Sequence, residues 1–279
     1  MNRASSKILA VIEVLLMLVI VLGLSRAISQ TPLKVWQLAH VHYAFHGHAL
    51  FALLPVLWLL LTRRSLAGYG LTSEHWKRDV IAALSCFLPL ALAGGSLGFL
   101  PYTRWGGALI ESAIQVGVLF WVAHLLSKKP EPESGIVTIV LALLMFGGYS
   151  FWKGLYPELG KGVAGFVFYF VFVGFGEEIL YRGYILTRLN EAFDRPWQFY
   201  GVGWGWGTVL AALTFGLTHA LNTVDLGSGR MAFAWGWGLW TFFSGLVFSY
   251  IREKTGSIIA PAIVHGLPQA LVYLLIDAF

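Results

Sequence analysis

Three short motifs in the C-terminal half place ionisable side chains inside long apolar stretches. Residues 176–182 read GEEILYR, residues 215–219 read FGLTH, and residues 265–269 read HGLPQ. An ionisable group at membrane depth costs roughly a few kcal/mol, so each needs a partner or a function. Carboxylates and imidazoles brought together in one cavity can activate a water molecule, which is hydrolytic chemistry.

The first motif predicts one paired and one unpaired carboxylate. Glu178 and Arg182 are four residues apart, so they share a helix face and can form an ion pair. Glu177 is rotated by about 100° from Glu178 and has no partner in its own helix. One carboxylate that is held and one that can take a proton suit acid–base catalysis. The alternative is a buried ion network that serves only structure.

The other two motifs add histidines. His219 lies one turn after Phe215, and His265 lies one turn before Gln269. Taken alone, His219 is more often a packing residue, and His265 with Gln269 is more often a polar contact between helices. All three motifs in one chain favour a shared site, provided that their helices place them at a similar depth.

The elements that must position these residues are apolar helices. Of the 279 residues, 57% are hydrophobic and only 12% are charged, whereas a soluble domain is about 25% charged. The apolar runs are too long for barrel strands and lack period-two alternation. We therefore expect an all-α, polytopic membrane protein with about eight to nine spans. The candidate spans are roughly 8–25, 44–62, 80–100, 106–127, 136–152, 163–187, 206–226, 231–251 and 257–276.

Composition also limits the partners and the compartment. The 12 Trp and 11 Tyr suit membrane interfaces, and the single cysteine, Cys86, excludes an internal disulfide. No nucleic-acid-binding motif is present. The apolar composition makes the lipid bilayer the expected environment. If nine spans alternate in direction, the segments on the same side of the membrane as the N-terminus hold twelve Lys and Arg. The segments on the opposite side hold six. This ratio predicts a cytoplasmic N-terminus, in a bacterial inner membrane. We expect the first run, residues 8–24, to be a retained helix and not a cleaved signal peptide.

The segment Lys128–Ser134 (KKPEPES) is the clearest hinge. It predicts accessory transmembrane helices over residues 1–135 and a catalytic core over residues 136–279. Before the second span, the run His40, His42, His46 and His48 could bind metal, but an interfacial helix end is the simpler interpretation.

The three motifs, in this order, resemble those of the CPBP (Abi) family of CAAX proteases and bacteriocin-processing enzymes, which includes the Ras-converting endopeptidase. The family motifs are EExxxR, FxxxH and a final His, and residues 255–261 (TGSIIAP) also resemble the family. The resemblance covers residues 136–279. One residue departs from the pattern, because Gln269 stands where the family has Asn or Asp.

The resemblance implies an intramembrane endopeptidase that cuts near the C-terminus of a prenylated or hydrophobic-tailed membrane-associated protein or peptide. Glu177, helped by His219, would activate water, Arg182 would hold Glu178, and His265 with Gln269 would stabilise the oxyanion. In the zinc-dependent alternative, Glu177, His219 and His265 would be the metal ligands. A non-catalytic membrane scaffold or transporter is the third possibility, because such groups also line ion pathways.

Overall fold

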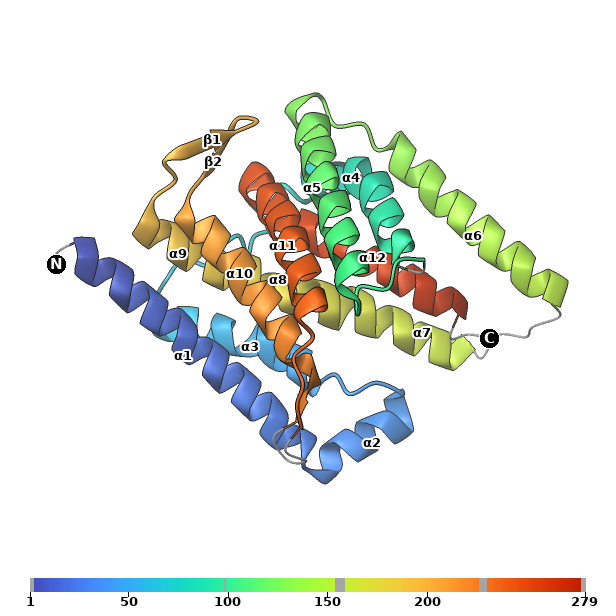
Figure 1. The fold of residues 1–279 in the computed structure, drawn as a ribbon, viewed down its shortest axis with the longest axis horizontal. Coiled ribbons are helices and arrows are strands. Elements are labelled where there is room, and N and C mark those ends of the chain that lie inside the picture. Colours follow the sequence, from blue (N-terminus) through green and yellow to red (C-terminus); the bar gives the residue numbers. More distant parts are fainter. Residues whose placement is uncertain (1–2, 98, 154–158, 226–229, 277–279) are drawn as a thin grey trace.

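The computed structural model describes residues 3–97, 99–153, 159–225 and 230–276, and these form a helical bundle (Figure 1). The N-terminal helices are α1 (Arg3–Ser29), α2 (Pro32–Val41), α3 (His46–Leu61), α4 (Trp76–Ser96), α5 (Trp105–Ser127) and α6 (Glu133–Lys153). The C-terminal helices are α10 (Trp206–Ala220), η3 (Leu221–Thr223), α11 (Trp235–Thr255) and α12 (Ile259–Ile276). The predicted all-α class is confirmed, and each expected span overlaps a helix, with different boundaries.

Between these two sets lies one continuous helical run with wider, π-helical turns. It consists of α7 (Leu159–Val167), η1 (Phe168–Phe175), α8 (Gly176–Glu178), η2 (Ile179–Ile185) and α9 (Leu186–Phe193). π-Helical turns are rare and occur frequently at functional sites. Here they flank the two adjacent carboxylates of α8 on both sides.

Four helices are long and apolar enough to cross a membrane: α1, α4, α5 and the run over residues 160–193. The pair α2 and α3 adds a fifth if this unit, bent by 112°, is one span. Among the described residues, length and composition therefore support an integral membrane protein with four to five clear spans. The expected count of eight to nine is not confirmed.

Two differences from the expected elements concern loops. Two short antiparallel hairpins occur, β1 (Trp197–Phe199) with β2 (Val202–Trp204), and β3 (Val224–Asp225) with β4 (Arg230–Met231). The span expected to reach residue 226 ends at Ala220. The carbonyl of Ala220 does not continue the helix. It accepts a hydrogen bond from the N–H of Ala234 at 2.9 Å. Apolar composition alone could not detect this end, because Leu221 is itself apolar.

The core consists of two apolar clusters. One is formed by α4, α5, α11 and α12, around Cys86, Val122 and Ile251. The other is formed by α1, α3, η2, α9 and α10, around Val21, Leu180 and Phe215. The run that contains α8 packs against α12 on one side and α3 on the other, and this fixes the carboxylates between the two halves of the chain.

A polar junction joins α1 to the end of this run. Glu13 of α1 accepts hydrogen bonds from Arg64, from Arg188 at 2.7 Å and from the hydroxyl of Tyr184 at 2.9 Å. Beside it, in the loop between α3 and α4, burial raises the pKa of Tyr69 to about 12. Because Glu13 lies in the first helix and Arg188 in the ninth, the junction fixes the N-terminal helix against the helix run that contains Glu177.

Candidate active site

Glu177 lies at the centre of three imidazole rings. Its Oε1 is 3.2 Å from Nε2 of His48, and its Oε2 is 4.0 Å from Nε2 of His219 and 3.8 Å from Nε2 of His265. The carboxylate is buried, and Oε2 has no hydrogen-bond partner among the described residues. A buried, unpaired carboxylate oxygen between two ring nitrogens is a strong acceptor for a polar hydrogen.

Two glycines allow the backbones around Glu177 to approach closely. A Cβ on Gly176 would lie 2.7 Å from the carbonyl oxygen of His48, so only glycine lets α8 contact the start of α3. A Cβ on Gly174 would lie 2.9 Å from the carbonyl oxygen of Ala262 and 3.0 Å from the Cα of Gly266. These contacts bring α12, and with it His265, against the run that contains Glu177.

Glu178 points the other way, into a fully buried ion pair. Its Oε1 accepts a hydrogen bond from Arg182 at 2.8 Å and lies 2.9 Å from Nδ1 of His265. The guanidinium of Arg182 stacks over the Phe215 ring at 4.2 Å, and Phe248 stacks on the His265 ring at 4.8 Å. The predicted pair of Glu178 and Arg182 therefore forms. Through Glu178 it also fixes the orientation of the His265 ring.

The hydrogen bonds of the two predicted histidines indicate which ring nitrogens hold protons. Nδ1 of His219 lies 2.8 Å from the carbonyl oxygen of Phe215, which can only accept, so Nδ1 carries a hydrogen. Nδ1 of His265 faces the carboxylate of Glu178 and donates in the same way. In both neutral rings, Nε2 is then the lone-pair nitrogen, and both Nε2 atoms lie towards Glu177 Oε2.

Five of the six predicted site residues come together: Glu177, Glu178, Arg182, His219 and His265. Gln269 does not join them by any hydrogen bond to a described residue. It is half-buried, one turn beyond His265 on α12. At this position the resemblance predicted an oxyanion donor, and that role stays a prediction.

His48 is a site residue that sequence reasoning did not find. The sequence predicts an interfacial helix end for the histidine run in which it lies, and its neighbour His46 is the first residue of α3. His46 Nδ1 lies 2.8 Å from Gln37 Oε1 and its Nε2 lies 2.9 Å from Ser29 Oγ, so both nitrogens serve helix packing. His48, later in the same helical turn, points to Glu177 instead. Its position outside the three motifs left no local signal in the sequence.

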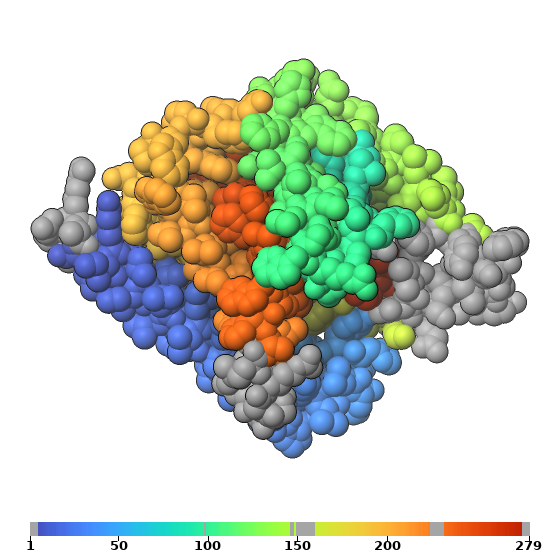
Figure 2. Space-filling view, viewed as in Figure 1, coloured from blue at the N-terminus to red at the C-terminus, as the bar shows by residue number. Residues whose placement is uncertain are grey.

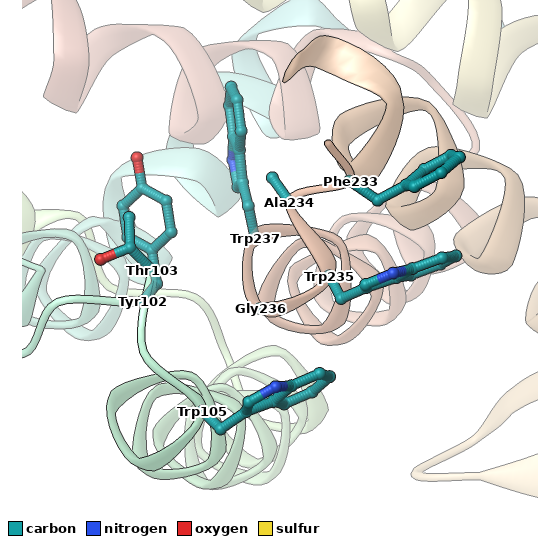
Figure 3. A pocket seen from close by; sticks show the side chains of 8 residues that line it. All are labelled: Tyr102, Thr103, Trp105, Phe233, Ala234, Trp235, Gly236 and Trp237. Carbon is teal, nitrogen blue, oxygen red and sulfur yellow. The ribbon is translucent and has the colours of Figure 1, made fainter. Parts of the chain in front are cut away.

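An aromatic cavity of about 170 Å³ lies between the segment before α5 and the start of α11 (Figure 3). It is lined by Tyr102, Thr103, Trp105 and residues 233–237. The Trp237 ring forms part of its wall and also packs edge-on against the His219 ring, with centroids 5.3 Å apart. Tyr102, from the segment before α5, faces Trp237 with ring centroids 6.0 Å apart. One indole therefore connects this cavity to the candidate site.

The spacing of the same side chains decides whether they fit a zinc ion. A tetrahedral zinc site needs its ligand atoms about 3.3 Å apart, since each ligand lies about 2.0–2.1 Å from the metal. The oxygen-to-nitrogen distances of 3.8 and 4.0 Å at Glu177 are wider. Among the described residues, no three His, Cys, Asp or Glu side chains are placed to hold a metal ion. The arrangement as it stands does not fit zinc.

Comparison with known proteins finds a family match in the C-terminal part of the chain. Residues 159–271 match the family model described as "Type II CAAX prenyl endopeptidase Rce1-like". This range contains all three motifs and the helix run around Glu177, but not His48. No curated protein and no solved structure matches the chain.

Proposed function

We propose that the chain is an intramembrane peptidase of the CAAX type in which Glu177 drives hydrolysis, and the Rce1-like match over residues 159–271 supports this proposal. Water would be the nucleophile, and the substrate would be a membrane-associated protein or peptide with an apolar tail. The unpaired Oε2 of Glu177 between two imidazole nitrogens is the observation that supports this proposal best.

The first step is activation of water. A separation of 4.0 Å between Glu177 Oε2 and His219 Nε2 is too long for a direct hydrogen bond but suits one bridging water. Such a water would donate one hydrogen to the carboxylate and one to the ring nitrogen. Its oxygen would then attack the peptide carbonyl carbon while Glu177 takes the proton.

The second step is collapse of the tetrahedral intermediate. The developing oxyanion needs a hydrogen-bond donor, and His265 supplies one at Nε2 when its ring is protonated, because Nδ1 already donates to Glu178. The C–N bond then breaks as Glu177 returns its proton to the leaving amine. The carboxylate is regenerated, and one water molecule is consumed for each peptide bond cleaved.

The aromatic cavity lined by Trp237 offers a place for a substrate side chain. Its volume of about 170 Å³ suits one large apolar or aromatic side chain. Because Trp237 lines the cavity and also packs against His219, a side chain held there would lie close to the bond attacked.

The test is cleavage by purified wild-type chain and by the Glu177→Gln variant. The substrates are peptides with an apolar or lipidated tail. We expect cleavage by the wild type and no detectable cleavage by the variant, with equal thermal stability. Activity retained by Glu177→Gln would overturn the assignment of Glu177. Stoichiometric zinc that is lost together with activity on chelation would favour the zinc-dependent alternative. A folded wild type that cleaves none of these peptides would favour a scaffold or transporter.

A further inference from the structure

Three helices have one end close to the candidate site: α3 and α11 have their starts there, and α10 has its end there. His48 is the third residue of α3, about 3 Å from its start and about 20 Å from its end. His219 is the residue before the last of α10, about 1.5 Å from that end and about 20 Å from the start. Trp237 is the third residue of α11, about 3 Å from its start and about 27 Å from its end.

Hydrogen bonds join two of these helix ends, those of α3 and α10, to the C-terminal end of α1. Ser29 Oγ lies 2.9 Å from His46 at the start of α3. Arg26 donates to the carbonyl of Leu221, directly after α10, at 3.2 Å. Figure 2 shows the first residues of α11 (orange) at this end, between the N-terminal helices (blue) and α4 and α5 (green). The site therefore lies towards the end of the bundle at which α1 finishes.

The exposed fraction of the side chains around Glu177 increases towards the same end of the bundle. The side chains of His48 and His219 are 25% and 14% exposed, whereas those of Glu178 and Arg182 are 0% and 1% exposed. Tyr181 and Phe215 are also buried on the side of Arg182. Exposure therefore increases towards the end of the bundle where α1 finishes, which we call the open end, and the ion pair and aromatic rings fill the opposite, closed side.

Basic residues gather at the other end. Arg78, at the start of α4, donates to the carbonyl of Thr255, the last residue of α11. Arg195, after α9, pairs with Glu253 at 2.6 Å. Lys7 of α1 lies 5.4 Å from the centre of the Phe193 ring. These residues belong to the set of twelve, against six, that predicts a cytoplasmic location for the start of α1.

We propose that the active site opens to the non-cytoplasmic side of the membrane and that its substrate is a translocated protein. This inference rests on the proposed peptidase function and specifies its substrate class. The cut would fall where the translocated part of that protein meets its apolar tail. A prenylated tail held in the cytoplasmic leaflet would instead meet the closed end.

The aromatic cavity lies at the open end and suits this role. Trp105, Phe233 and Trp235 on its rim are exposed, as aromatic side chains at a membrane–water interface are. A polypeptide that leaves the membrane on this side would pass the cavity before it reaches His219.

Cysteine labelling tests the orientation without any need for activity. Cys86 is the single cysteine and is buried, so a Cys86→Ala background provides a chain free of thiols. Asn222→Cys, exposed just after α10, reports on the open end, and Lys129→Cys, exposed between α5 and α6, reports on the basic end. In intact spheroplasts that express the full chain, we expect a membrane-impermeant maleimide to label position 222 only. Position 129 should react only after permeabilisation. The reverse pattern would overturn the proposal.

Activity in oriented membranes then tests the substrate class. A membrane-impermeant peptide with an apolar tail, added outside spheroplasts, should be cleaved, whereas the same peptide added to inside-out vesicles should not. Cleavage only in inside-out vesicles would contradict the proposed substrate class. If labelling shows the expected orientation but neither preparation cleaves, the peptidase proposal fails while the inferred orientation stands.

Discussion

His48 Nε2 lies 3.2 Å from Glu177 Oε1 across 129 residues of chain. A ring nitrogen that faces a carboxylate oxygen at this distance carries the hydrogen of the bond when the carboxylate is ionised. The bond occupies Oε1 and fixes the rotation of the carboxylate, so that Oε2 points to His219 and His265. The N-terminal helices thus help to orient the group that would activate water.

Replacement of His48 should lower kcat and leave KM nearly unchanged, because the bond acts on Glu177 and not on the substrate. For His48→Leu we expect a loss of about 100-fold in kcat, as is typical when a catalytic group is displaced by about 1 Å. His48→Gln keeps an N–H donor near the position of Nε2 and should recover much of the rate. Steady-state kinetics on an apolar-tailed peptide measure both values.

The matched control for His48 is His40→Ala. His40 is exposed on α2, and within the part of the chain that the structure describes its hydrogen bond is to the carbonyl of Trp36 in its own helix. Its replacement should change neither kcat nor stability. If His48→Leu and His48→Gln lost the same activity, or if both lowered the melting temperature in proportion to activity, His48 would be a packing residue and no more.

Arg182→Met should strongly destabilise the protein. It leaves the Glu178 carboxylate, which is fully buried, without its guanidinium partner. Loss of one partner from a buried ion pair typically costs about 3–5 kcal/mol. Reversible unfolding in mixed micelles would measure the difference, and Lys254→Met, which removes an exposed cation near the end of α11, is the control.

The double variant Glu178→Gln with Arg182→Met separates stability from function. Because neither charge then remains buried alone, much of the stability should return. Activity should stay low, since the neutral amide introduced at position 178 is a weaker acceptor for Nδ1 of His265 than the carboxylate. A double variant as unstable as Arg182→Met would show that the aromatic contacts of Arg182, not its charge, hold this region.

Trp105→Ala should raise KM about tenfold for substrates with a large apolar side chain next to the cut, equivalent to about 1.4 kcal/mol. Trp105 lines the cavity, but the cavity ring that packs against His219 is that of Trp237, so kcat should change little. Trp237→Ala, in contrast, removes the ring that packs against His219 and should lower kcat as well. Kinetics on peptides that differ only in this side chain provide the measurement.

The control for the cavity is Trp76→Ala, an exposed tryptophan at the start of α4, at the basic end of the bundle. It should leave KM unchanged. An equal rise in KM for Trp76→Ala and Trp105→Ala would mean that loss of any interfacial tryptophan matters, and the cavity would have no specific role.

The helices and the paired carboxylate were predictable because both are local properties. Residues four apart, such as Glu178 and Arg182, lie on the same face of an α-helix wherever the helix occurs. Long apolar runs form helices in a membrane. The end of α10 and the two hairpins were not predictable in this way. They depend on contacts between distant segments, such as Ala234 with Ala220, which no local pattern encodes.

His48 shows the same limit within the site. Its neighbours His40, His42 and His46 gave a composition typical of a helix end, and nothing local set one of the four apart. His48 differs from the other three because its backbone carbonyl packs closely against Gly176. This contact is a property of the folded chain. The division into accessory residues 1–135 and a catalytic core stays a prediction, although His48 and Glu13 contact residues across that boundary.

The glycine at position 176 also limits how freely the two halves of such proteins can be exchanged. A related catalytic segment grafted onto these N-terminal helices would fit only if it too had glycine before the first glutamate, because any side chain there would collide with the α3 backbone. The recipient helices would in turn need a donor like His48. Chimeras that respect this pairing are the ones we would expect to assemble.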